Sequence, residues 1–306
     1  MEGLQAQRLI FAPSRARRQE RLVRGALGVC AAISVATTLG IVGSLIFETL
    51  GFFRSVSLRE YFTATRWAPT FSPAGFGVAP LVTATLLIAA IGAAVAFPLG
   101  LGTAIYLSEY ARAPVRRVIK PILEVLAGIP TVVFGYFALL FITPEVVERL
   151  VGVSGANALS AGIGVGIMIV PLVASISEDA MRAVPWSLRE GAYAVGASRR
   201  KVATRVVVPA ALSGIAAGFI LGLARAIGET MIVTIAAGGI ANLSLDPREA
   251  MQTMTAYIVQ VSQGDTPAGS PAYRTIFALG TTLFAMTLAL NVIAFRVVRR
   301  FRERYE

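Results

Sequence analysis

Two oppositely charged side chains, Arg225 and Glu229, interrupt an otherwise apolar stretch of the sequence. They are four residues apart, so a helix would place them on one face, with Glu229 as the resting partner of Arg225. A guanidinium presents a fork of donors that suits the oxygens of phosphate or a carboxylate. We therefore expect Arg225 to bind an anion, with the Thr230 hydroxyl near the same ligand. The alternative is a purely structural ion pair that fixes helix packing.

The residue types needed for catalysis or metal binding are scarce. The sequence contains no His and a single Cys, Cys30. An intrachain disulfide and His-based acid–base or metal chemistry are therefore excluded. The G-x-x-x-x-G-K-[ST] run that cradles nucleotide phosphates is also absent. We expect no catalytic residue, no metal and no cofactor bound by this chain. If ATP drives its action, a partner ATPase must hold the ATP and Mg²⁺.

A second charged stretch indicates helix packing rather than chemistry. Lys120 precedes Glu124 by four residues, and we expect the two to pair on one helix face. Gly128, Pro130 and Gly135 follow within the next turns. Proline interrupts a helix and glycine lets another backbone approach, so these residues predict a kinked, closely packed helix.

Membrane helices must hold these groups, because 56% of the 306 residues are hydrophobic. Several uncharged apolar runs are long enough to cross a bilayer. The predicted fold class is therefore an all-α polytopic membrane protein with six transmembrane helices. The fifth run is longer than one straight crossing requires, so it should tilt or break. The predicted spans are, approximately, 22–47, 78–106, 118–142, 157–176, 202–238 and 274–298.

The net charge of +11 reports the orientation of the chain rather than a ligand. Six spans place both termini on one side, and most of the 28 Lys and Arg residues then lie on that side. The positive-inside rule makes it the cytoplasm, so the charge does not indicate nucleic acid. The predicted organisation is a cytoplasmic tail (1–21), a first transmembrane helix with an external loop (22–77), a core of five transmembrane helices (78–298) and a second cytoplasmic tail (299–306).

A basic stretch, 185–209, joins the fourth and fifth spans on the cytoplasmic side. Ser187 and Glu190 have the spacing of a capping box, which predicts a short helix from Leu188. Gly196 suits the left-handed residue that ends such a helix. We predict a helix–turn–helix at the membrane surface and call residues 185–209 the elbow. The alternative is an ordinary short basic loop between membrane helices.

The elbow contains an ordered series of residues: Glu190, Gly191, Ala192, Gly196, Val206, Val208 and Pro209. This order and its spacing resemble the EAA loop of ABC-importer permeases, with Gly191 replacing the first Ala of that loop. In that family the loop forms a coupling helix, which docks in a groove of the ATPase subunit. The residues that the resemblance assigns to ATPase coupling are Glu190, Gly191, Ala192, Gly196, Arg199 and Pro209.

Two further strings, LAGIPTVVFGYFAL at 126–139 and GLARAIGETM at 222–231, are similar to the PstC family of phosphate ABC importer permeases. The resemblance implies a MetI-like type I importer fold in the cell inner membrane, which moves inorganic phosphate by alternating access. It also implies a PstA-like second permease, two PstB-like ATPase subunits and a periplasmic PstS-like phosphate-binding protein. Met231 favours the PstC pattern over the PstA pattern, which typically continues with Ala and Pro.

Three alternatives stay open at this point. The anion could be another oxyanion, such as molybdate or sulfate. The chain could instead be the PstA-like partner subunit. A non-transporting membrane scaffold or sensor is the third alternative, and it would leave the elbow unexplained.

Overall fold

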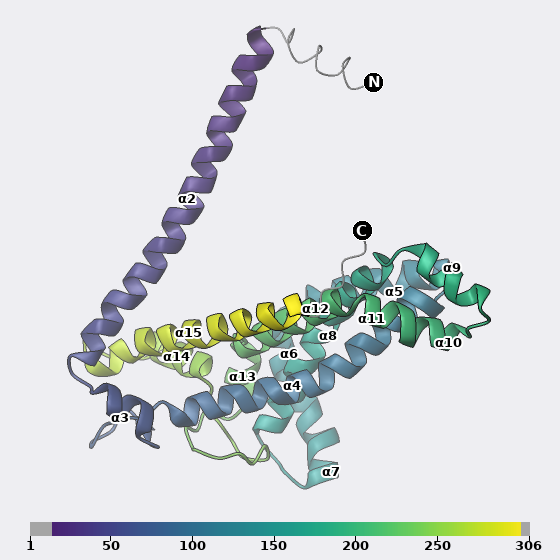
Figure 1. Cartoon of the computed structure of the whole chain (residues 1–306). Helices are drawn as coiled ribbons and strands as arrows, with labels where there is room; N and C mark the ends of the chain where they lie inside the picture. The colour runs from purple at the N-terminus through teal and green to yellow at the C-terminus, as the bar shows by residue number, and fades with distance from the viewer. Residues whose placement is uncertain (1–13, 301–306) are drawn as a thin grey trace.

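The computed structural model describes the backbone of residues 14–300 and the side chains of residues 20–296. Residues 1–13 and 301–306, which belong to the two predicted tails, lie outside the described residues. The described chain is almost entirely helical, with one two-stranded sheet (Figure 1). Helix α2 (Ser14–Phe53) begins inside the segment predicted as a tail, so the end of that segment is helical.

Six segments of the described chain have the length and composition of a membrane crossing, if a pair of helices bent by 71° is taken as one. The prediction of an all-α membrane protein with six such helices is confirmed. The segments are Glu20–Phe53, Ala79–Tyr110, Thr131–Val151, Ala158–Arg182, the bent pair Arg199–Ala210 with Leu212–Ile227, and Pro271–Arg296.

Helix α2 is the outermost of these segments, and Figure 1 shows it diverging from the other helices toward its N-terminus. Most of its apolar side chains are exposed, as expected for a helix that faces lipid. It packs against α15 (Pro271–Arg300), where Thr49 Oγ1 lies 2.8 Å from Thr281 Oγ1. The first span is therefore attached to the side of a bundle formed by the later spans.

Short elements from two parts of the chain cover one end of the bundle, and three of them lie in the segment predicted as an external loop. The Trp67 side chain is buried, and its ring meets the Tyr257 ring edge-on with 5.1 Å between centroids. Edge contacts between aromatic rings stabilise such a cap beyond the area that they bury. The elements are α3 (Leu58–Thr63), β1 (Trp67–Ala68), its antiparallel partner β2 (Gly75–Phe76) and α14 (Met254–Gln263).

The core is built around α4 (Ala79–Ile105) and α8 (Ala158–Arg182), which pack closely along their length. Glycine makes this approach possible, because a Cβ at Gly100 would lie 2.7 Å from the Cγ1 of Val173. Lipid provides no hydrophobic force between helices, so membrane helices rely on close packing at small residues. The α4–α8 pair is the frame against which the later helices are placed.

Three segments of the described chain have wide, π-helical turns. In the first of them the Ala111 N–H donates to the Tyr106 carbonyl, five residues back, at 2.7 Å. Such turns are rare and often occur near functional sites. The segments are η1 (Tyr106–Tyr110), η2 (Ala138–Glu148) and η3 (Ala203–Val207).

The third span differs from the predicted range, 118–142. The chain breaks between Gly128 and Pro130, because proline lacks an N–H and disfavours a helical conformation of the residue before it. The part before the break is strongly amphipathic and is not among the membrane-crossing segments of the described chain. The span therefore begins after the break. The elements are α5 (Ala113–Ala127), α6 (Thr131–Phe137), η2 and α7 (Arg149–Val151).

The elbow is a helix–turn–helix, but the predicted capping box is wrong. Its first helix begins at Trp186 with Pro185 as N-cap, and no side chain caps it. Pro185 holds the extended conformation required of an N-cap, so Ser187 lies inside the first turn and cannot cap the helix. Gly196 has φ +77°, the left-handed conformation expected for it. The elements are α9 (Trp186–Ala194), α10 (Arg199–Val202), η3 and α11 (Val208–Ala210).

The fifth span is broken, as its length predicts. Helix α12 (Leu212–Ile227) makes an angle of 71° with the segment that precedes it, and the bend is at Ala211. A second break at Gly228 separates α12 from the short helix α13 (Met231–Ala236). The 202–238 run is thus three separate helical pieces rather than one tilted helix.

Candidate functional site

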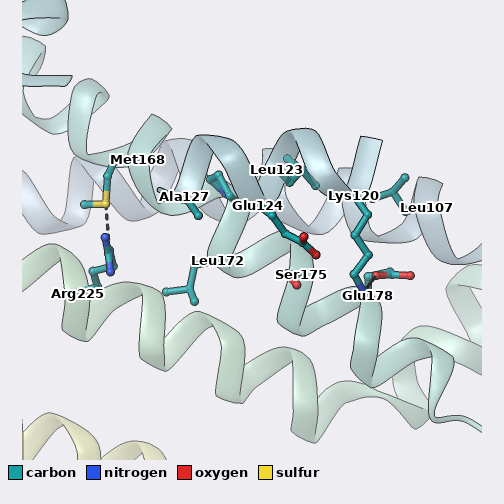
Figure 2. A pocket seen from close by; sticks show the side chains of 11 residues that line it. Leu107, Lys120, Leu123, Glu124, Ala127, Met168, Leu172, Ser175, Glu178 and Arg225 are labelled. Atoms are coloured by element: carbon teal, nitrogen blue, oxygen red, sulfur yellow. Dashed lines mark hydrogen bonds and ion pairs between the residues drawn. The ribbon is translucent and has the colours of Figure 1, made fainter. Parts of the chain in front are cut away.

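A cavity of about 210 Å³ lies between α5, α8 and α12, and Arg225 borders it near the end of α12 (Figure 2). The Arg225 Nε donates to the Sδ of Met168 on α8, at 3.1 Å. Leucine, alanine and proline side chains form much of the wall, so the polar groups there are few. They come from Lys120, Glu124, Ser175, Glu178 and Arg225.

The predicted pairing of Arg225 with Glu229 is wrong. Helix α12 ends before Glu229, so the two residues do not share a helix face. Instead, the buried Glu229 carboxylate accepts hydrogen bonds from the backbone N–H groups of Met231 and Ile232, at 3.0 and 3.2 Å. The first N–H groups of a helix lack intrahelical partners and favour a negative charge. Glu229 therefore caps α13.

The Thr230 hydroxyl is turned toward its own backbone. Its Oγ1 donates to the Gly228 carbonyl at 3.2 Å. The Thr230 carbonyl in turn accepts from Thr234 Oγ1 at 2.6 Å. Thr230 thus closes the turn between α12 and α13, and its contact with a translocated ligand stays a prediction.

An ion-pair cluster that was not predicted from the sequence occupies the other end of the cavity. Lys120 Nζ lies 2.8 Å from Glu178 Oε2 and 2.9 Å from Asp179 Oδ1, both on α8. The predicted Lys120–Glu124 pair is therefore wrong, and Glu124 is an exposed residue on the cavity wall. Hydrogen bonds to the two carboxylates raise the pKa of Lys120. Arg182 Nη1 also lies 3.6 Å from Glu178 Oε1. The signal in the sequence was a pair of carboxylates at the end of an apolar span, with one arginine beside it for two negative charges.

Of the two cations that line this cavity, Arg225 is the one that can still bind an anion. Two carboxylates compensate Lys120, whereas a thioether such as that of Met168 is a weak, uncharged acceptor. Within residues 20–296, no carboxylate lies within ion-pair distance of Arg225. Figure 2 shows Glu124 and Ser175 between the two charged ends. The arrangement can hold an oxyanion against the guanidinium.

Most residues that the resemblance assigns to ATPase coupling face outward on the elbow. Glu190, Gly191, Gly196 and Pro209 are exposed, and a Cβ on either glycine would meet no atom within 4 Å. Ala192 is half-buried and packs against the apolar cluster beneath the elbow. The exposed residues leave an open surface on the first helix and its turn.

The elbow's arginines hold it to the core. Arg199 donates from Nε to the Glu109 carbonyl at 2.7 Å, and its guanidinium lies over the Tyr110 ring at 5.2 Å. Arg189, which no sequence pattern singled out, is buried and pairs with Glu109 Oε1 at 3.0 Å. A basic residue in a basic surface segment gives no sign that it will be buried. These contacts fix where the elbow lies on the core.

A break separates α5, which lines the cavity, from α6. Helix α5 ends at Ala127 with Gly128 as its C-cap, and Pro130 is the N-cap of α6. A Cβ on Gly135 would lie 3.2 Å from the Ile232 Cα of α13, so glycine allows a close approach there.

Among the described side chains, no group of His, Cys, Asp and Glu is arranged to hold a metal ion.

Residues 96–306 match the model of a protein family described as "Binding-protein-dependent transport system inner membrane component". The chain belongs to this family. The match includes both the cavity and the elbow, whereas α2 precedes it. As a member of this family, the chain is a membrane-spanning permease subunit of a transport system, and its part is translocation.

Relatives of this inner membrane component include named permeases. A probable ABC transporter permease protein, YqgH, from Bacillus subtilis is 35% identical over 278 residues, which cover 90% of each chain. A phosphate transport system permease protein, PstC, from Mesorhizobium japonicum is 33% identical over 300 residues, which cover 90% of this chain and 88% of the relative.

Solved transporters share the fold at low sequence identity. A bacterial ABC transporter that imports the acidic polysaccharide alginate has a TM-score of 0.64 at 14% identity, covering 94% of this chain and 100% of the other. The MetNI methionine ABC transporter in an inward-facing conformation has a TM-score of 0.54 at 18% identity, covering 74% and 95%. The MetI-like permease fold expected from the resemblance is thereby confirmed.

Proposed function

We propose that this chain is the permease subunit of an ATP-driven ABC importer that moves inorganic phosphate across the inner membrane. Relatives described as PstC phosphate permeases, 33% and 31% identical over most of this chain, support the proposal. The observation that carries it is Arg225, a guanidinium that borders a cavity between spans and donates to a thioether. Phosphate offers the paired oxygens that such a fork binds.

As phosphate passes Arg225, its oxygens replace the Met168 sulfur as acceptors of hydrogen bonds from the guanidinium. The contact must be strong enough to attract the anion and weak enough to release it. A weak neutral acceptor suits this requirement, because it holds the side chain in place without the cost of breaking an ion pair. Glu229 takes no part as a counter-ion, since its carboxylate caps α13.

The elbow docks in a groove of an ATPase subunit, and ATP and Mg²⁺ are bound there rather than by this chain. The exposed surface of α9 supports this assignment, because a short helix laid into a groove is a common recognition mode. Two PstB-like ATPases, a PstA-like second permease and a PstS-like periplasmic phosphate-binding protein complete the importer. Both termini of the chain lie in the cytoplasm.

Transport proceeds by alternating access. Closure of the ATPases on ATP draws the elbows of the two permeases together and opens the path outward. The binding protein then releases phosphate into the path, and hydrolysis returns the inward-facing state. A permease for sulfate or molybdate would use the same guanidinium chemistry, so the anion is decided by experiment.

The test is reconstitution in proteoliposomes with the candidate ATPase, second permease and phosphate-binding protein. We expect the chain to copurify with the ATPase, and loaded binding protein to stimulate ATP hydrolysis. Uptake of labelled phosphate should resist excess sulfate and molybdate. Uptake that follows sulfate or molybdate instead would overturn the phosphate assignment. A chain that never associates with an ATPase would support a scaffold or sensor.

A further inference from the structure

Glu109 is a buried carboxylate at the elbow end of the core, and the proposed path for phosphate does not use it. It lies in η1, where the α4 span ends, and is 8% exposed. Its Oε1 lies 3.0 Å from Nη2 of Arg189, a residue of α9 that is 5% exposed. Ser108 Oγ donates to the same oxygen at 2.9 Å. A buried ion pair thus links a core span to the elbow.

Arg189 also reaches the end of α8. Its Nη1 donates to the Val184 carbonyl at 2.7 Å, and Nη2 donates to the Met181 carbonyl at 2.8 Å. Carbonyls at a helix C-terminus are short of intrahelical partners, and a cation is favourable beside them. One side chain of the elbow therefore holds both principal helices of the core, α4 through η1 and α8 directly.

The second arm of the elbow is fixed to the same residue. Arg199, the first residue of α10, donates from Nε to the Glu109 carbonyl at 2.7 Å. Its guanidinium carbon lies 5.2 Å from the centroid of the Tyr110 ring, where the negative face of the ring attracts a cation. Glu109 thus holds α9 through its side chain and α10 through its backbone.

A purely structural pair is the simpler explanation, because apolar residues can often replace a buried ion pair without loss of stability. The geometry points to a further role, since the contacts of both elbow arms converge on one residue where a span ends. We propose that Glu109, Arg189 and Arg199 form a transmission joint, through which movement of the elbow reaches α4 and α8. They are positioning residues for the coupling of ATP hydrolysis to transport, so the inference rests on the proposed function.

The coupling ratio tests the joint: phosphate taken up per ATP hydrolysed by the reconstituted importer. Glu109→Gln and Arg199→Gln should each lower this ratio about tenfold while the complex still assembles, a typical size for energetic coupling between sites. Arg200→Gln is the matched control, because Arg200 is exposed, directly follows Arg199 in the chain and carries the same charge. A wild-type ratio in both joint variants would overturn the proposal.

Glu109→Gln leaves Arg189 buried without its counter-ion, so this variant could fail to fold. Glu109→Met combined with Arg189→Met removes both charges and should restore assembly. We expect this double variant to associate with the ATPase and hydrolyse ATP, but with the coupling ratio still lowered about tenfold. A native ratio in the double variant would mean that the pair only packs, and the joint would be rejected.

A distance measurement separates failure of the joint from failure of the phosphate assignment. Spin labels at Val195→Cys in the elbow and Gly102→Cys on α4, in a Cys30→Ser background, report whether the two parts move together. Val195 is 85% exposed, and a Cβ at Gly102 meets no atom within 4 Å. ATP binding should leave the separation fixed in the labelled native complex.

In a complex that combines Glu109→Gln with Arg199→Gln, ATP binding should change the distance between the two labels, because the elbow would then move without α4. This readout requires the ATPase but no transported anion. If ATP has the same effect on the separation in both complexes, the joint does not exist, whatever the substrate. If ATP changes the label distance in the joint variant only, and phosphate uptake is absent even in the native complex, the joint stands and the substrate assignment fails.

Discussion

Arg225 donates from Nε to the Sδ of Met168 at 3.1 Å, so its charge lies against a sulfur atom of the neighbouring span rather than a carboxylate. A thioether is a weak acceptor. An oxyanion would offer two charged oxygens to the same guanidinium, and charge-assisted hydrogen bonds are about twice as strong as neutral ones. The contact therefore holds the side chain at the cavity and competes little with an anion.

Replacement of Arg225 should remove most transport. Arg225→Gln loses the charge, and hydrogen bonds to charged groups are worth about 1.5–3 kcal/mol, so uptake at low phosphate should fall roughly 10- to 100-fold. Arg225→Lys should recover little, because a point charge cannot reproduce a two-pronged fork. The measurement is phosphate uptake normalised to the amount of ATPase-associated complex.

Met168→Leu is the control for Arg225, since it removes the sulfur and nearly conserves the volume. We expect uptake close to that of the native chain. Native uptake by Arg225→Gln at normal abundance would exclude a role of Arg225 in the pathway.

Glu229 should behave as a helix cap. Glu229→Gln keeps a side-chain oxygen for the N–H groups of Met231 and Ile232, so the free energy of unfolding should change little. Glu229→Ala removes the acceptor and should cost about 1 kcal/mol. Thermal unfolding of the purified chain measures both variants. If Glu229→Ala unfolds like the native chain, the carboxylate does not support α13, and the capping assignment is incorrect.

The position of Glu229 shows how far residue spacing predicts geometry. Apolar length is a local property, so the six spans could be predicted from the sequence. The four-residue spacing of Arg225 and Glu229 is informative only within an unbroken helix, and α12 ends at Ile227. The break is held by distant contacts, such as the Thr255 hydroxyl that donates to the Glu229 carbonyl at 2.7 Å. A contact of this kind leaves no trace in local sequence.

Lys120→Met should destabilise the chain, because the Glu178 carboxylate, 1% exposed, loses its nearest cation and keeps only Arg182, at 3.6 Å. A buried group that loses its partner costs about 1–3 kcal/mol, and a charged one more. Lys120→Arg should be near native, and Lys120→Met with Glu178→Met should recover part of the loss. Unfolding by denaturant measures the series. Glu124→Gln is the control, and a loss there as large as that of Lys120→Met would restore the pair predicted from the sequence.

The same cluster has a defined dependence on pH. Its hydrogen bonds to Glu178 and Asp179 raise the pKa of Lys120 from 10.5, so its stabilising effect is complete below that value and is lost as pH rises through the higher folded pKa. The free energies of unfolding of the native chain and Lys120→Met should therefore differ by a constant amount between about pH 6 and about pH 9. A difference that vanishes within that range would show that Lys120 is not the charged partner.

The two glycines of the elbow offer a matched pair of substitutions. A Cβ would meet no atom within 4 Å at either residue, but Gly196 has φ +77° whereas Gly191 lies inside α9. Gly196→Ala should cost about 1–2 kcal/mol, because L-residues avoid the left-handed region. Gly191→Ala should stabilise the helix by up to about 1 kcal/mol.

Copurification with the ATPase, compared at equal chain abundance, measures the effect of these glycines on the elbow. We expect Gly196→Ala to weaken the association, because the turn between the two arms would be displaced, and Gly191→Ala to weaken it less. Equal association of both variants would argue against a required left-handed turn at Gly196.

The elbow was predictable in outline and its attachment was not. Glycine at position 196 indicated a turn between two helices, and the basic residues around it indicated the cytoplasmic side. The burial of Arg189 depends on Glu109, which is 80 residues earlier in the chain. The third span shows the same limit, since an apolar run continues through the break at Pro130. Apolar composition predicts burial or lipid contact, but a proline within the run decides where the helix can continue.

Labelling should decide the orientation of the chain. In a Cys30→Ser background, single cysteine substitutions at Thr70, Gly152 and Gly264 should react with an impermeant reagent in intact cells. Substitutions at Ala113 and Ser198 should react only after the membrane is opened, as should one at Arg302, which lies outside the described residues. Reaction of Ser198→Cys in intact cells would reverse the predicted topology.

The π-helical turn at the end of α4 limits how this chain can change in length. Its hydrogen bond from the Ala111 N–H to the Tyr106 carbonyl spans five residues, one more than in an α-helix. Deletion of one residue from 106–110 would restore the four-residue spacing of a regular α-helix and would leave the chain on either side of the turn nearly in phase. Glu109 lies inside the turn, so its contacts with Arg189 and Arg199 depend on the extra residue. Length variation in this turn is therefore limited by the contacts that Glu109 makes with the elbow, and not by the continuity of the helix.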